Sequence, residues 1–140
     1  MPNLSNADLI RRAAKGIEAM LADGAREANL TRRQLDVLLM ISDNPGISQS
    51  AMLDLCSMDR STLSGVVRLM HKRGYIKRSD DPKDQRAELC NLTTEGQAAA
   101  RKAQKIKSKV DREIEKAVES AASFGGRLEA IWKKREARVV

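Results

Sequence analysis

The chain has 140 residues, enough for one domain with a buried core, and 41% of them are hydrophobic. Aromatic residues make up only 2%, so the core must be built from Leu, Ile, Val, Met and Ala, which favours packed helices over a β-sandwich or barrel. No apolar run is long enough to span a membrane, and the N-terminus lacks a signal-peptide core. We therefore expect a cytoplasmic protein with reduced thiols.

The positive charge of the chain is concentrated in one segment. The formal net charge is +7, and the segment from Arg60 to Arg86 holds eight Lys and Arg against three Asp. An excess of this size predicts a polyanionic partner. A membrane surface would also attract it, but a local patch on a folded helix and hairpin favours nucleic acid, and we expect no membrane partner.

The first third of the chain predicts two helices. Apolar residues recur at helical spacing from about Ser5 to Ala22, and Gly24 stands where this helix should end. Thr31 is the predicted N-cap of a second helix, which ends near Asp43. The following Asn-Pro-Gly sequence marks a turn, because Pro cannot continue a helix and Gly permits a positive φ.

A third and a fourth helix and a hairpin are predicted next. Ser48 caps the third helix, and Asp59 caps the fourth. The apolar positions of the fourth helix form one face, which consists of Leu63, Val66, Val67 and Met70. Gly74 is placed to end it. Residues 75–78 and 86–92 are then predicted strands, joined by a charged loop over residues 79–85.

Two further helices complete the predicted fold. Thr93 caps the longest one, whose apolar residues repeat every three or four positions from Ala99 to Ala121. Gly125-Gly126 is expected to bend or end it, and a last helix carries Ile131 and Trp132. The fold class is therefore mainly α, with a two-stranded β-wing. We expect residues 30–93 to form the DNA-binding region, and residues 1–29 and 94–140 to contribute the helices of a dimer interface.

Two short helices joined by a tight turn and followed by a basic hairpin form the layout of a winged helix-turn-helix. The polar face of the fourth helix presents hydroxyl and guanidinium groups, which hydrogen-bond to base edges and phosphates. Arginine in the hairpin suits the negative potential of the minor groove. The residues predicted to contact double-stranded DNA are Gln49 and Ser50 in the third helix, Arg60, Ser61, Thr62, Ser64 and Arg68 in the fourth, and Lys83 and Arg86 in the hairpin.

Four motifs, in this order and spacing, resemble the MarR (multiple antibiotic resistance regulator) family. They are residues 59–65 in the fourth helix, 73–78 after it, 80–86 in the hairpin and 92–96 at the start of the long helix. The resemblance, which begins at Leu30, covers about half of the chain. It implies a homodimeric regulator, more often a repressor than an activator, that binds a pseudo-palindromic operator.

The resemblance also implies particular roles for residues outside the fourth helix. The Asp-x-Arg pattern of the family's wing falls on Asp84 and Arg86. Dimers of the family join through their first and last helices, which places the expected interface on Leu9, Ile10, Ala13, Ile17, Ile106, Val110, Ile114, Ile131 and Trp132. Many members release DNA when a small, often phenolic or anionic, effector binds, and others use a cysteine switch.

Several alternatives stay open at the level of sequence. Cys56 and Cys90 are most simply small buried hydrophobic residues, with a redox-responsive regulator as the alternative. Because aromatic residues are scarce, three possibilities remain for how the regulator is controlled: an aliphatic effector, a vestigial pocket without an effector, or control by protein abundance. A winged-helix module that binds other proteins is a further alternative. We predict no catalytic residue, cofactor or metal: His71 is the single histidine, and neither a nucleophile–base pair nor a phosphate-binding glycine loop is present.

Overall fold

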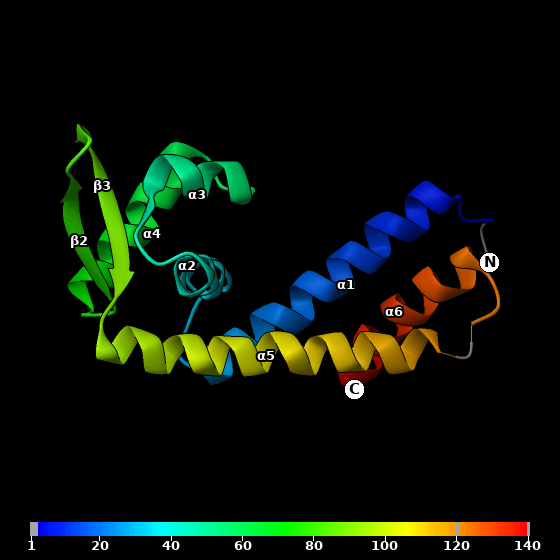
Figure 1. Ribbon diagram of the computed structural model, residues 1–140. Helices are drawn as coiled ribbons and strands as arrows, with labels where there is room; N and C mark the ends of the chain where they lie inside the picture. The colour runs from blue at the N-terminus through cyan, green and yellow to red at the C-terminus, as the bar shows by residue number, and fades with distance from the viewer. Residues whose placement is uncertain (1–2, 120, 140) are drawn as a thin grey trace. The chain divides into compact units, whose positions relative to one another are not determined.

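The computed structural model describes residues 3–119 and 121–139, and the chain divides into two compact units. Unit 1 combines residues 1–27 with residues 105–140, and unit 2 comprises residues 28–104. The described residues form six helices and three short strands (Figure 1), which confirms the predicted class of a mainly helical winged helix-turn-helix. None of these helices combines the length and the apolar character that crossing a bilayer requires.

Unit 2 contains the helix-turn-helix and the hairpin. Its elements are α2 (Arg32–Asp43), β1 (Ile47–Ser48), α3 (Gln49–Leu55), α4 (Arg60–Lys72), β2 (Ile76–Asp81), β3 (Asp84–Leu92) and the beginning of α5 (Thr94–Val118). Unit 1 contains α1 (Asn6–Glu27), the remainder of α5 and α6 (Phe124–Val139).

The core of unit 2 is aliphatic, as the composition predicts. Three of the four residues of the predicted apolar face of α4 point into it, since Leu63, Val67 and Met70 are at most 1% exposed, whereas Val66 is only half-buried. The other fully buried members of this core are Leu35, Val37, Leu38 and Ile41 of α2, Met52 of α3, Ile76 of β2 and Cys90 of β3. Since burial of each large aliphatic side chain contributes about 1.5–3 kcal/mol, this cluster is the main source of stability in unit 2.

Local capping signals place the ends of the helices of unit 2. Thr31 and Gln34 form a reciprocal capping box, in which each side chain accepts from the other's backbone N–H. The Asp59 side chain accepts from the Thr62 backbone N–H at 2.7 Å at the start of α4. Gly74, just beyond α4, has a φ of +82°, a value that glycine adopts without steric cost. These ends agree with the sequence prediction.

The sheet has three strands instead of the predicted two. Its order is β1-β3-β2, fully antiparallel, with Ile47 opposite Cys90 and Ile76 opposite Leu92. The sequence does not reveal β1, because two residues are too few to show an alternating pattern. The predicted loop over 79–85 is also wrong: pairing continues to Asp81 and Asp84, with a bulge between Asp80 and Asp81, and only two residues form the turn.

Gly24 does not end the first helix, contrary to the sequence prediction. Helix α1 continues to Glu27 because Gly24 lies where α1 meets α5: a Cβ at this position would be 2.5 Å from Cγ2 of Ile106. The glycine therefore permits close approach between two helices of unit 1. Met20, one turn earlier on α1, and Val110 on α5 are buried in the same unit.

The end of the long helix also differs from the prediction. Helix α5 ends at Val118, and α6 begins at Phe124, where the Ser123 hydroxyl accepts from the Gly126 backbone N–H at 3.0 Å. Gly125-Gly126 therefore lies in the first turn of α6 instead of ending α5. The side-chain cap supplied by Ser123 outweighs the low helix propensity of two glycines.

Because of the Gly24 contact, replacing Gly24 or Gly65 by alanine should change the free energy of unfolding in opposite directions. Gly24→Ala should lower the free energy of unfolding by about 1–2 kcal/mol, because overpacking against Ile106 exceeds the gain in helix propensity. Gly65→Ala is the matched control: no atom lies within 4 Å of its Cβ position, so it should gain roughly 0.5–1 kcal/mol. Urea unfolding measures both. If Gly24→Ala lowers the free energy of unfolding as much in an Ile106→Ala background as in the parent protein, the packing explanation is wrong.

Candidate nucleic-acid interface

The face of α4 opposite its core side is polar and accessible. Arg60, Ser61, Ser64 and Arg68 are exposed, and Thr62 is half-buried at the start of the helix. Gly65 lies among them with open space around its Cβ position. Because the buried positions 63, 67 and 70 fix the rotation of the helix, these hydroxyl and guanidinium groups are held on the outside of unit 2.

The carboxyl group of Asp59 secures the beginning of this helix. The backbone N–H of Thr62 is the main cause that holds the pKa of Asp59 below its ordinary value of 3.8, with the Thr62 side chain and the charge of Arg33 acting in the same direction. The carboxylate is therefore ionised at neutral pH, where it stabilises the N-terminus of α4.

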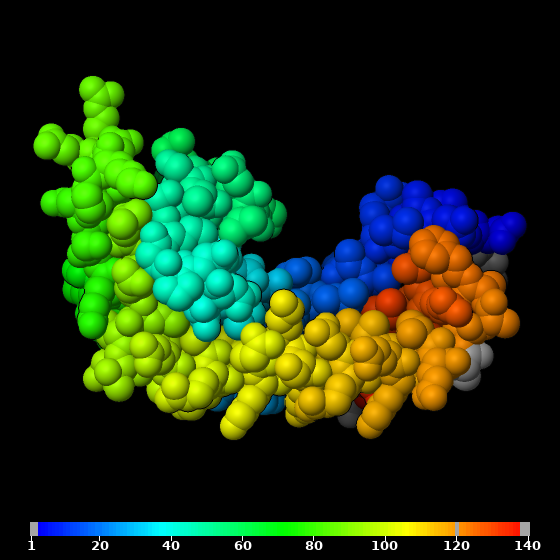
Figure 2. Space-filling model, viewed as in Figure 1, coloured from blue at the N-terminus to red at the C-terminus, as the bar shows by residue number. Residues whose placement is uncertain are grey.

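The hairpin projects from unit 2, and its tip stands clear of the helices of that unit (Figure 2). Lys83, Asp84 and Arg86 are all exposed. Two side-chain bonds shape the tip: Asp81 accepts from the Lys83 backbone N–H at 2.9 Å, and Asp84 accepts from the Arg86 backbone N–H at 3.0 Å. Such Asx turns hold the backbone in place around the two basic side chains.

A hollow of about 320 Å³ lies between α3, α4 and the hairpin. It brings together four of the residues predicted from sequence, Gln49, Ser50, Arg60 and Arg86. Ser61, Thr62, Ser64, Arg68, Lys83 and Asp84 do not line it. The sequence analysis missed Arg78, Gln85 and Glu88, which also line it; the alternation of side chains along β2 and β3 was the available signal.

Arg73, one residue beyond α4, connects three parts of unit 2. Its guanidinium donates to Gln34 Oε1 at 3.2 Å, to the Asn29 carbonyl at 3.3 Å and to the Tyr75 hydroxyl at 3.2 Å, and it lies 4.8 Å from the centre of the Tyr75 ring. Asn29 has a φ of +60° and Gln34 is buried. Arg73 therefore holds the end of α4 against the connection that leads into α2.

The two cysteines have different environments. Cys90 is buried in β3, as predicted, and burial raises the pKa of its thiol above the ordinary value of 9.0. Cys56 is only half-buried at the C-terminal end of α3, so the expectation of a buried hydrophobic residue is wrong there. Its Sγ lies 3.9 Å from the Met58 carbonyl oxygen.

The residues expected at a dimer interface all belong to unit 1 and differ in exposure. Ala13, Val110 and Ile131 are buried within a single chain, because α1 packs along α6 and approaches α5 closely at Gly24. Ile10 is 47% exposed, and the remaining residues, Leu9, Ile17, Ile106, Ile114 and Trp132, are half-buried. Phe124, which the sequence analysis did not select, is 59% exposed at the start of α6.

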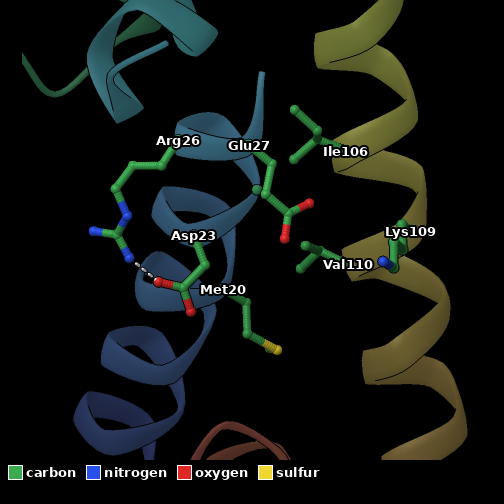
Figure 3. A pocket seen from close by; sticks show the side chains of 8 residues that line it. Met20, Asp23, Arg26, Glu27, Ile106, Lys109 and Val110 are labelled. Carbon is green, nitrogen blue, oxygen red and sulfur yellow. Dashed lines mark hydrogen bonds and ion pairs between the residues drawn. The ribbon is translucent and has the colours of Figure 1, made fainter. Parts of the chain in front are cut away.

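A cavity of about 590 Å³ lies between α1 and α5 of unit 1. Met20 and Glu27 point from α1 towards α5, and Ile106 and Val110 point back towards α1 (Figure 3). Asp23 forms an ion pair with Arg26 at its edge, and Lys109 completes the charged lining. No aromatic side chain is among the lining residues, which are aliphatic or charged.

The arrangement of unit 2 defines a class of protein. A helix-turn-helix whose second helix exposes a polar, basic face, followed by an antiparallel hairpin with exposed basic residues, is a winged helix-turn-helix. Residues 28–87 match the family model described as "MarR family". Over these residues, which contain three of the four sequence motifs in full, the chain is similar to the MarR family.

Three known proteins illustrate the similarity. The transcriptional regulator HosA of Escherichia coli O111:H- is 35% identical over 86 residues, which are 61% of this chain and 64% of HosA. The HTH-type transcriptional repressor NicR of Pseudomonas putida is 29% identical over 90 residues, 64% of this chain and 57% of NicR. The solved structure of the PcaV transcriptional regulator from Streptomyces coelicolor, in complex with its natural ligand, has a TM-score of 0.69 and 25% identity, covering 99% of this chain and 96% of PcaV. The matched segments thus span less than two thirds of HosA and NicR.

Loss of the Arg73 contacts should destabilise unit 2. Arg73→Ala removes three hydrogen bonds, and we expect the free energy of unfolding to fall by about 1–2 kcal/mol. Arg73→Lys keeps the charge but not the planar fork, so it should restore less than half of the loss. Arg68→Ala, on the exposed face of the same helix, should stay within about 0.5 kcal/mol of the parent in urea unfolding. Equal effects at positions 68 and 73 would contradict this role.

The two thiols should differ in reactivity and in their effect on alkaline stability. Iodoacetamide should label Cys56 in the native protein and Cys90 only after unfolding, as read by peptide mass spectrometry. Because the pKa of Cys90 is raised in the folded state, its contribution to stability is complete below pH 9.0 and is lost as the pH rises through the folded-state pKa. Cys90→Ala should therefore show a smaller alkaline loss. Rapid native labelling of Cys90 would contradict its burial.

Proposed function

We propose that the protein is a sequence-specific, double-stranded DNA-binding transcriptional regulator that acts as a repressor. The observation that carries the proposal is the outward face of α4, on which Arg60, Ser64 and Arg68 are exposed. The opposite side of the helix buries Leu63, Val67 and Met70. A helix of this kind fits the major groove, where hydroxyl and guanidinium groups hydrogen-bond to base edges. The repressor role is supported by the name of NicR.

The remaining predicted contacts are assigned by position. Ser61 and Thr62 lie at the beginning of α4, where they are placed to read or position the duplex together with Arg60. Gln49 and Ser50 begin α3 and would contact the DNA backbone. Lys83, Asp84 and Arg86 lie in and next to the turn of the hairpin, where Arg86 would enter the minor groove and Asp84 would orient it.

A homodimer is part of this proposal, because a pseudo-palindromic operator requires two copies of α4. We assign the dimerisation surface to residues 1–29 and 94–140 and DNA binding to residues 30–93. Within the first surface, the exposed Ile10 and Phe124 are the large apolar side chains that a partner chain would cover. Buried Ala13, Val110 and Ile131 would support that surface from inside.

A small-molecule effector would bind in the cavity between α1 and α5. Its lining joins the aliphatic side chains of Met20, Ile106 and Val110 with the charged groups of Glu27 and Lys109. That composition favours an amphipathic, non-aromatic effector over a phenolic one, because no ring is present to stack on a phenol. The PcaV structure with its natural ligand supports regulation by a small molecule.

Selection from random DNA duplexes tests the function. A regulator enriches a two-fold symmetric sequence, whereas a protein-interaction module binds duplexes weakly and without preference. We propose no enzymatic activity, in keeping with relatives that are named transcriptional regulators. The same proposal places the protein in the cytoplasm, where its DNA partner lies. Recovery of no preferred sequence at low salt would reject the regulator and favour the protein-interaction alternative.

The wing assignment has its own test. Arg86→Ala should weaken binding to the selected duplex and reduce the slope of log Kd against log salt by about 0.9, the loss of one phosphate-equivalent. Arg112→Ala removes the same charge from an exposed position of unit 1 that is not one of the apolar residues assigned to the dimer interface, and it should leave the slope unchanged. Fluorescence anisotropy over a range of KCl concentrations measures both. An unchanged slope and Kd in Arg86→Ala would remove the hairpin from the interface.

A further inference from the structure

Three arginines from three different elements line the hollow between α3, α4 and the hairpin. Arg60 comes from α4, Arg78 from β2 and Arg86 from β3. Asp80 and Glu88, from the two strands, line the same hollow. The net charge of these five side chains is therefore +1, whereas the three arginines alone would give +3. Both the convergence of the arginines and the presence of the carboxylates need a physical reason.

The ladder of the hairpin explains how these charges meet. Arg78 is opposite Cys90, and Asp80 is opposite Glu88, so Arg78 and Glu88 are diagonal neighbours on one face of the sheet. The Glu88 carboxylate accepts from Nε of Arg78 at 2.8 Å and also pairs with Nη2. The Arg78 side chain is only 28% exposed. Glu88 thus holds a half-buried guanidinium in one orientation.

This pairing occupies one edge of the guanidinium and leaves the other available. Arginine carries five N–H donors, and Nη1 of Arg78 has no partner among residues 3–119 and 121–139. The neutral donors Gln49 and Ser50 lie on the same lining. A tetrahedral oxyanion with several acceptor oxygens matches this set of donors.

We propose that this hollow receives one backbone phosphate of the duplex, that Arg78 contacts it, and that Glu88 and Asp80 restrain this attraction and so limit the affinity for every duplex. This inference rests on the proposed function. Phosphate contacts give affinity without sequence information, so an unopposed cluster of three arginines would favour any DNA. Two fixed carboxylates lower this sequence-independent part of the affinity, and the difference between duplexes is left to the contacts of α4 with the bases.

Two variants separate the parts of the proposal. Arg78→Gln removes the phosphate contact: binding to the selected operator and to a random duplex should weaken by similar factors, and the salt slope should fall by about 0.9. Glu88→Gln keeps an acceptor for Arg78 but removes the charge. It should tighten binding to the operator and to the random duplex by similar factors, about two- to fivefold at low salt, so that the ratio between them is kept. Asp80→Asn should act in the same direction.

A control variant and operator DNA with uncharged methylphosphonate groups test the proposal further. Glu115→Gln makes the same charge change at an exposed position of unit 1 that is not one of the apolar residues assigned to the dimer interface, and it should leave both affinities unchanged. Operator duplexes with single methylphosphonate substitutions should reveal one position per half-site at which the parent protein loses affinity and Arg78→Gln does not. Arg78→Lys should keep the salt slope, and circular dichroism melts verify that each variant is folded.

The outcomes are distinct from a failure of the proposed function. If the parent protein selects no sequence, the regulator proposal itself fails. If it selects an operator but Arg78→Gln keeps the full salt slope, the phosphate contact is wrong. If Glu88→Gln weakens binding to both duplexes, the carboxylate only orients Arg78 and the restraining role is wrong. Displacement of the duplex by inorganic phosphate at matched ionic strength, from the parent and not from Arg78→Gln, would assign the hollow to a free anion instead.

Discussion

The burial of one side of α4 is the constraint on which the rest of unit 2 depends. Leu63, Val67 and Met70 can reach the aliphatic core only if the helix takes one rotation about its axis. That rotation sends the short hydroxyl side chains and the two guanidinium groups outward. The recognition surface is therefore a by-product of core packing, and it needs few interactions of its own to hold it in position.

Electrostatics then adjusts this surface locally. Acidic residues interrupt the basic segment from Arg60 to Arg86 and the strand that follows it, and several of them have a structural role. Asp81 and Asp84 accept backbone N–H groups in the tip, and Glu88 pairs with Arg78. A net charge alone would hide this arrangement. The positions of the acids determine which arginines remain free to meet a polyanion and which are partly neutralised.

The sequence was sufficient for features that depend on neighbouring residues. The capping residues Thr31 and Asp59, the left-handed Gly74 and the apolar face of α4 all follow from local rules, and the structure has them where the patterns predict. Features that depend on distant residues were missed. Gly24 looks like a helix end until Ile106 is seen beside it, and β1 exists only because Ile47 finds Cys90. The hollow, with its Arg78–Glu88 pair, likewise required the register of two strands.

The extra strand β1 supports only the inner part of the hairpin. Near Leu89 and Cys90, β3 is paired on both edges, whereas farther out it is paired with β2 alone and interrupted by the bulge at Asp80. The hairpin is thus paired on both edges of β3 near its base and on one edge only towards its tip. The end of the hairpin that is paired on both edges is joined through Ile47 of β1 directly to the start of α3, which ties the hairpin to the helix-turn-helix through the backbone as well as through the core.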